Sequence, residues 1–126
     1  MKWIVKPTEN INGLEFGTSR EDVRAELGNP KKEFKKSKFS KNTTDDYGDF
    51  HVFYDGNNLL EAIEIFEGKV LVGETVIFPC SINEIIQIDN SFIKEEDGCI
   101  STKLSIGAYA PNGEVESILV GCANYY

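Results

Sequence analysis

Apolar and polar residues recur with helical spacing in the stretch LEFGTSREDVRAELGNP, residues 14–30, where Val23 and Leu27 lie four residues apart on one face. Residues typical of helix ends bracket this pattern: a capping box of Thr18 with Glu21, a C-cap glycine, Gly28, and a stop signal, Pro30. The pattern predicts a helix of about ten residues. Because a helix this short is not stable alone, its apolar face must pack on a sheet.

Strand patterns follow this helix, in runs of aromatic and β-branched residues separated by turn residues. We expect strands in four segments: the Lys-rich KKEFKKSKFSK (31–41) around Phe34 and Phe39, DFHVFY (49–54), LLEAIEIF (59–66) and KVLVG (69–73). DGNN, residues 55–58, predicts a hairpin turn between the second and third of them. The first half is therefore a helix followed by an antiparallel meander.

The second half repeats this plan at two offsets. At an offset of 62 residues the helix matches FPCSINEIIQIDN, with Phe16 aligned to Phe78, Ser19 to Ser81, Asp22 to Glu84, Val23 to Ile85 and Gly28 to Asn90. At an offset of 55 the hairpin YDGNNLLEAIEI matches YAPNGEVESILV, with Tyr54 aligned to Tyr109 and Ile63 to Ile118. Chance similarity is the alternative, since few residues are identical. The common order of caps, turn and apolar positions favours duplication.

Helix and turn signals recur in the second copy. Ser81 and Glu84 form a second capping box, Asn90 suits a left-handed C-cap, and PNG (111–113) suits a second hairpin turn. The helix-to-hairpin connection is shorter here by seven residues, at the place where the first copy carries extra polar and basic material. We expect repeat one at about 11–72 and repeat two at about 73–126.

Two such units bury their apolar faces only against each other. The sequence therefore predicts a single α+β domain over residues 1–126, an antiparallel sheet with two short helices on one face. The other face of that sheet is then free to be a binding surface.

Charge narrows the choice of partner. The 126 residues carry a formal net charge of −8, which repels nucleic acid and anionic membranes. The Lys-rich segment holds six of the 13 basic residues, so the remaining surface is strongly acidic. We interpret the segment as a soluble edge strand protected by lysines. The alternative, a nucleic-acid stripe interleaved with aromatic residues, is opposed by the charge of the rest.

Compartment follows from apolar runs and cysteines. No run reaches the length of a membrane span, and MKWIVKPTEN loses its apolar character too soon for a signal peptide, so we expect a cytosolic protein. The three cysteines, Cys80, Cys99 and Cys122, have no CxxC spacing and fit buried thiols in a reducing compartment. Cys80 lies at a predicted helix N-terminus, where the helix dipole can lower the pKa of a thiol.

Candidate chemistry is sparse. His51 is the single histidine and is open to three interpretations: a pH switch, a general base acting with Asp49 in a small enzyme, or a surface strand residue. The acidic cluster Asp45, Asp46, Asp49 and Asp55 lacks the spacing of a calcium loop, which leaves a solvated loop or a patch that engages a basic partner. KEEDGC adds a second acidic group, Glu95, Glu96 and Asp97, which we expect at the same end of the sheet as the first.

The segment FGTSREDVRAELGNP resembles the helix signature of the BamE/SmpA outer-membrane assembly lipoproteins and of the tandem-repeat beta-lactamase inhibitor proteins. In those families, small α+β modules bind other proteins without catalysis, and the inhibitors hold their target enzyme on the concave face of a sheet. The resemblance implies the same binding logic here. A cytosolic relative with that logic would be a bacterial toxin-immunity protein.

We therefore expect an inhibitor that occludes a basic bacterial toxin domain, a nuclease for preference, as a monomer in a 1:1 complex. No enzyme activity, cofactor, metal, nucleic acid or membrane is expected. Candidate anchors are Trp3, Tyr47, Tyr54 and Tyr109. The full set of expected partner-binding residues is Asp45, Asp46, Tyr47, Asp49, His51, Tyr54, Asp55, Glu95, Glu96, Asp97 and Tyr109. The alternative is a non-catalytic BamE-like interaction module of an envelope assembly complex.

Overall fold

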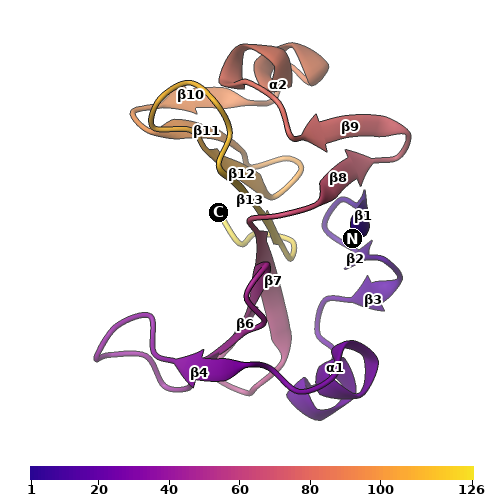
Figure 1. The fold of residues 1–126 in the computed structure, drawn as a ribbon, viewed down its shortest axis with the longest axis vertical. Helices are drawn as coiled ribbons and strands as arrows, with labels where there is room; N and C mark the ends of the chain where they lie inside the picture. The colour runs from indigo at the N-terminus through magenta and orange to yellow at the C-terminus, as the bar shows by residue number, and fades with distance from the viewer.

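Two sheets and two short helices make up the fold in a computed structural model that describes all residues, 1–126 (Figure 1). The small sheet has the strand order β3 (Leu14–Glu15), β2 (Asn10–Ile11), β1 (Lys2–Lys6), β8 (Lys69–Val72) and β9 (Thr75–Phe78). The large sheet has the order β10 (Ile93–Glu95), β11 (Gly98–Ser101), β12 (Ile106–Tyr109), β13 (Ser117–Gly121), β7 (Leu60–Ile65), β6 (Phe50–Tyr54), β5 (Thr44–Asp46) and β4 (Lys32–Phe34). The helices are α1 (Arg20–Leu27) and α2 (Ile82–Ile88).

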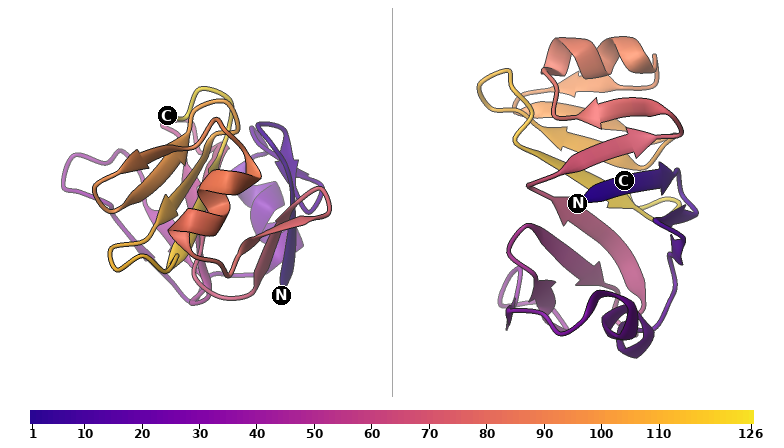
Figure 2. Two further views of the ribbon diagram at one scale, coloured as in Figure 1. Left: turned by 90° about the horizontal axis from the view of Figure 1, so that it is seen from above. Right: turned by 45° about the vertical axis from the view of Figure 1, so that its right-hand side comes forward.

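The predicted α+β class is confirmed, but the strands form two sheets instead of one. The helices and the small sheet lie on the same side of the large sheet, with one helix toward each end (Figures 1 and 2). The second sheet exists because residues 2–6, which we did not expect to form a strand, become β1. This strand pairs antiparallel with β2 and parallel with β8, so it links the hairpins β2–β3 and β8–β9, which the sequence did not predict.

The two halves have the same topology. In the large sheet, strands β4 to β7 correspond in order to β10 to β13. In the small sheet, the β2–β3 hairpin corresponds to β8–β9, and the two hairpins lie on either side of β1. Strand β8, which we expected in repeat one, thus corresponds to β2 and begins the second half. A common origin of the halves by duplication stays a prediction.

Backbone contacts recur at the two offsets that the sequence predicts. The amide of Arg20 donates to the carbonyl of Asn58 at 2.9 Å, and Ile82, 62 residues later, donates to Gly113, 55 residues after Asn58, at 2.9 Å. Nine residues (35–43) connect β4 to β5, whereas two (96–97) connect β10 to β11. This difference is the predicted seven residues, and it falls in the basic segment. The edge position of β4 is also confirmed, although Phe39 lies in the loop that follows it.

One strand departs from the predicted alignment. Val52 of β6 and Ala108 of β12 occupy equivalent pairs with β7 and β13, an offset of 56 instead of 55. Adjacent residues in a strand face opposite sides of a sheet, so this change alters which side each residue faces. As a result Tyr54 points into the core and Tyr109 points away from it.

Helix caps agree with the sequence in part. The capping box of Ser81 and Glu84 is confirmed by hydrogen bonds in both directions, at 2.9 and 3.2 Å. In α1 the N-cap is Ser19, not Thr18, because the Thr18 hydroxyl donates to the carbonyl of Glu15 instead.

The C-caps of the two helices differ from the sequence prediction in different ways. Gly28 ends α1 with the positive φ expected of a C-cap glycine, 85°, but its ψ of −175° lies outside the left-handed helical region. Helix α2 ends at Ile88. Its C-cap is Asp89, one residue before the expected Asn90, and the backbone of Asp89 is extended.

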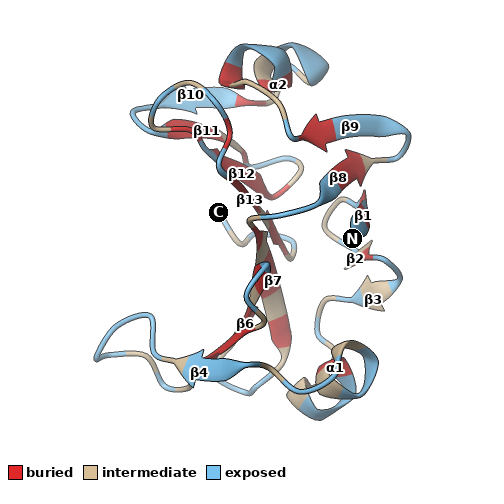
Figure 3. Ribbon diagram, viewed as in Figure 1, coloured by how far each residue is buried: buried red, intermediate tan, exposed pale blue.

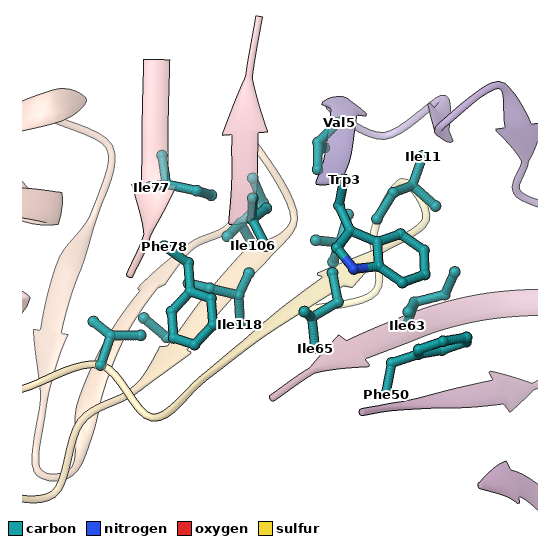
Figure 4. Close-up of a cluster of buried hydrophobic side chains, with 14 of the residues drawn as sticks. Trp3, Val5, Ile11, Phe50, Ile63, Ile65, Ile77, Phe78, Ile106 and Ile118 are labelled. Atoms are coloured by element: carbon teal, nitrogen blue, oxygen red, sulfur yellow. The ribbon is translucent and has the colours of Figure 1, made fainter. Parts of the chain in front are cut away.

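One continuous core lies between the sheets. Figure 4 shows Trp3 and Ile11 from the small sheet's side facing Phe50, Ile63 and Ile65 of the large sheet. Val23 of α1 and Ile85 of α2 belong to the same cluster. Buried residues follow the central strands of the large sheet, whereas edge strands β4 and β10 are mostly exposed (Figure 3).

The assignment of the α1 cap can be tested by two neighbouring substitutions. Ser19→Ala removes the acceptor for the Asp22 amide and should lower the free energy of unfolding by about 1 kcal/mol. Thr18→Ala leaves that cap in place and should cost less than about 0.5 kcal/mol. Urea unfolding at neutral pH measures both, and a larger loss from Thr18→Ala would restore the sequence-based assignment.

Candidate functional site

One face of the large sheet is not covered by any helix or strand, and we name it the open face (Figure 1, to the left of β6, β7 and β13). Its central row follows from strand register and runs from β6 to β10: His51, Glu64, Leu119, Gly107, Ile100 and Ile93. The residues before and after most of these positions belong to the core on the opposite side. The free sheet face predicted from the sequence is therefore present.

Aromatic rings surround His51 on the first-half side of the open face. The imidazole centroid lies 5.1 Å from the Phe34 ring and 4.8 Å from the Phe66 ring, both edge to face. The Lys36 Nζ lies 4.1 Å from the centroid of Phe53. This side of the face is thus apolar at its floor with a basic side chain above it.

Two tyrosines cross the middle of the open face. Tyr125 and Tyr126 lie against Gly121 and Gly107, and a Cβ at either glycine would overlap the tyrosine above it. These glycines therefore make room for the rings. Burial, and then the nearby Tyr125 and Glu64, raise the pKa of the Tyr126 hydroxyl well above its usual range.

A hollow of about 280 Å³ occupies the second-half side of the open face. Its floor and walls include Ile100, Leu119, Tyr109 and Tyr126, and its acidic residues are Glu64, Glu95 and Asp97. None of the twelve lining residues is basic. Tyr109 is 49% exposed and Tyr126 40%, and Ile93, which pairs with Ile100 in the next strand, is 64% exposed, so large apolar surfaces face solvent here.

The two acidic groups lie toward opposite edges of the large sheet, since Asp45 and Asp46 belong to β5 beside edge strand β4, and this corrects the expectation that both groups share one end. The loop 35–43 with its lysines follows edge strand β4, while Glu95, Glu96 and Asp97 lie at edge strand β10. The reason is the two-fold relation of the halves, which sends equivalent connections to opposite edges. The open face therefore has one basic and one acidic end.

Asp45 does not belong to an exposed acidic cluster. Its side chain is 0% exposed and accepts hydrogen bonds from Arg24 Nε at 2.8 Å, Arg24 Nη2 at 2.6 Å and Arg20 Nη2 at 2.5 Å. The Tyr54 hydroxyl donates to it at 3.2 Å. Burial alone would raise the pKa of Asp45, but the two arginines outweigh burial and hold that pKa below its usual value.

The other members of the predicted acidic cluster are separated. Asp46 is buried and contacts His51 Nε2 at 3.4 Å, so it takes the place beside His51 that we had assigned to Asp49. Asp49 is exposed in the turn before β6 and forms no ion pair with His51. Asp55 accepts from the amides of Asn57 and Leu59 within its own turn. The prediction that the four carboxylates form a single surface patch is therefore wrong.

Two of the expected anchors belong to the interior, and a third, Tyr47, is partly buried and packs against the core. Trp3 and Tyr54 are core residues. Tyr47 stacks on Phe50, with ring centroids 4.7 Å apart, and donates its hydroxyl to the carbonyl of Gly28. Only Tyr109 among the four is exposed on the open face. The contacts of His51, Tyr109, Glu95, Glu96 and Asp97 with a partner stay predictions.

Sequence reasoning missed several open-face residues: Phe34, Phe53, Glu64, Phe66, Leu119 and Tyr126. A usable signal was present in the strand 60–65, where Ala62 and Glu64 alternate with Ile63 and Ile65. That alternation assigns Glu64 to the face opposite the core.

Features for other chemistry are weak. Burial, followed by the charge of Glu84, raises the pKa of Cys80 to about 11, so the expected lowering by the helix dipole is wrong. No three His, Cys, Asp or Glu side chains gather in a way that could hold a metal ion. Neither helix has the length and apolar character to cross a membrane.

No family model, no curated protein and no solved structure matches this chain.

The buried carboxylate predicts a specific stability defect. Asp45→Asn leaves Arg20 and Arg24 with only the exposed Glu33 as a counter-charge and should lower the free energy of unfolding by about 3 kcal/mol. The exposed Asp49→Asn, as control, should change it by less than about 0.5 kcal/mol. Urea unfolding at pH 7 measures both, and equal effects would contradict the role of Asp45.

The pH dependence has a defined sign. Because the pKa of Asp45 is lower in the folded protein than in the unfolded chain, its stabilisation is complete above the unfolded value of about 3.9 and is lost as pH falls through the folded value. Wild-type protein should therefore lose stability below about pH 4 more steeply than Asp45→Asn.

Proposed function

We propose that this protein is a non-catalytic inhibitor that binds another protein on the open face. In this proposal it is a cytosolic bacterial immunity protein that neutralises a basic toxin domain, most consistently a nuclease, by covering its active site. The supporting observation is the open face itself, a broad sheet surface with exposed aromatic and aliphatic side chains. Aromatic residues at the centre of a concave or flat patch are typical binding anchors.

Charge supports a basic partner. The hollow beside Tyr109 is lined by three carboxylates and no basic residue, and the whole chain carries a net charge of −8. A nuclease presents a cationic groove to its substrate, so carboxylates and aromatic rings on this face could take the place of phosphates and bases. The lysines of loop 35–43 at the other end would fix the orientation of the partner.

Matched variants on two faces test the proposed binding surface. Ile93→Ala with Tyr109→Ala truncates the open face, while Ile4→Ala with Val76→Ala truncates exposed residues on the outer face of the small sheet. In affinity capture from host-cell extract, a basic protein should bind wild type and the Ile4/Val76 control. The affinity of the open-face variant for the purified partner should fall by about 100-fold.

A growth assay then tests neutralisation. Expression of the captured protein alone should arrest bacterial growth, and co-expression of wild-type chain should restore growth. The open-face variant should protect poorly. A harmless partner, or equal binding and protection by both double variants, would contradict the proposal.

Association with the purified partner should depend on salt and on the acidic end. Glu95→Gln, Glu96→Gln and Asp97→Asn together should slow association by about tenfold at low ionic strength, with little change in dissociation. Glu21→Gln, Asp22→Asn and Glu26→Gln on α1 remove the same charge from a distant exposed surface and provide the control. Surface plasmon resonance at increasing salt measures both, and a flat salt dependence argues against electrostatic steering.

A further inference from the structure

Glu64 is a half-buried carboxylate without a cationic partner. It lies on β7 in the middle of the large sheet, between His51 of β6 and Leu119 of β13. One carboxylate oxygen accepts the Ser117 hydroxyl at 2.9 Å, and Glu64 takes part in no ion pair. Removing part of a charge from water without pairing it costs free energy, so stability alone does not explain this residue.

Basic side chains on the same face are engaged elsewhere. His51 and Lys32 both contact Asp46, at 3.4 and 3.7 Å. Lys36 lies over the Phe53 ring and donates to the Tyr125 hydroxyl at 3.3 Å. No side chain of this chain therefore supplies the counter-charge that Glu64 lacks.

The surroundings of Glu64 fit a long cationic side chain. Leu119, directly beside it, offers an apolar floor for a methylene stem. Tyr109 and Tyr126 line the same hollow and supply aromatic rings, groups that attract cations. Glu95 and Asp97 add negative charge at the far side of the hollow.

We propose that the open face receives an arginine side chain of the partner, with its guanidinium paired to Glu64 and its stem over Leu119. Arginine fits better than lysine because a planar guanidinium stacks on tyrosine rings and pairs with a carboxylate through two hydrogen bonds. This inference rests on the proposed function, since it names the chemistry with which the partner would be recognised.

Short peptides test the assignment without the partner. Ac-Gly-Arg-Gly-NH₂ added to ¹⁵N-labelled protein should shift the amide signals of Gly98, Gly107 and Leu119 saturably at millimolar concentration. The citrulline peptide, which keeps the shape and loses the charge, should bind about tenfold more weakly. The lysine peptide should also bind more weakly than the arginine peptide.

Two substitutions separate Glu64 from general acidity. Glu64→Gln should weaken the arginine peptide by about tenfold, whereas Glu96→Gln, an exposed acid outside the hollow, should weaken it less than about twofold. The Tm of Glu64→Gln should be unchanged or higher, because the substitution removes an unpaired charge. A clearly lower Tm would assign Glu64 a structural role and overturn the inference.

Other results overturn it as well. Equal binding of arginine and citrulline peptides, tighter binding of the lysine peptide, or shifts spread over all acidic surfaces would each reject an arginine site at Glu64. If these results occur while the open-face variant still loses its captured partner, only the arginine assignment fails. If the peptide binds as expected and no toxin is neutralised, the proposed function fails instead.

Discussion

The antiparallel pairing of β7 with β13 is the interaction on which the rest of the structure depends. It joins the last strand of each half and places Ile65 opposite Ile118 and Ile63 opposite Val120 on the core side. The same register sets Glu64 beside Leu119 on the open face. A slip of one residue would turn the isoleucines to solvent and the carboxylate into the core, which is costly on both counts. One register therefore specifies both the core and the candidate binding surface.

Strand β1 completes this arrangement. The two-fold relation of the halves leaves the hairpins β2–β3 and β8–β9 on either side of a central position, which a single strand can fill only by pairing antiparallel with one and parallel with the other. Trp3 of this strand packs edge to face on Phe50 of the large sheet, with ring centroids 4.8 Å apart. The small sheet is thereby held on one side of the large sheet, and the open face stays uncovered.

Local sequence signals were sufficient to predict the two helices, the hairpin turns at 55–58 and 111–113, and the seven-residue difference between the halves. They failed where a distant residue decides the outcome. Asp45 follows polar residues in the sequence, a context that predicts a solvent-exposed side chain. In the structure Arg20 and Arg24, one helical turn apart on α1, both donate hydrogen bonds to it. Strand β1 was missed because an unrepeated segment gains its partners only from the assembled halves. The binding face was predicted as a face, while its residues required the strand register.

Two carboxylates, Asp45 and Glu64, differ in whether a cation pairs with them, and this difference indicates where a binding site lies. Asp45 is wholly buried, and this fold surrounds it with two arginines and a tyrosine hydroxyl. Glu64 is half-buried and receives only the Ser117 hydroxyl. The chain thus pairs a carboxylate fully where the interior requires it and leaves another without a cation amid exposed aromatic residues. Departures of this kind from local stability concentrate at functional sites. The unpaired carboxylate and the exposed rings occupy one surface, and their coincidence supports our proposal that a partner binds on the open face.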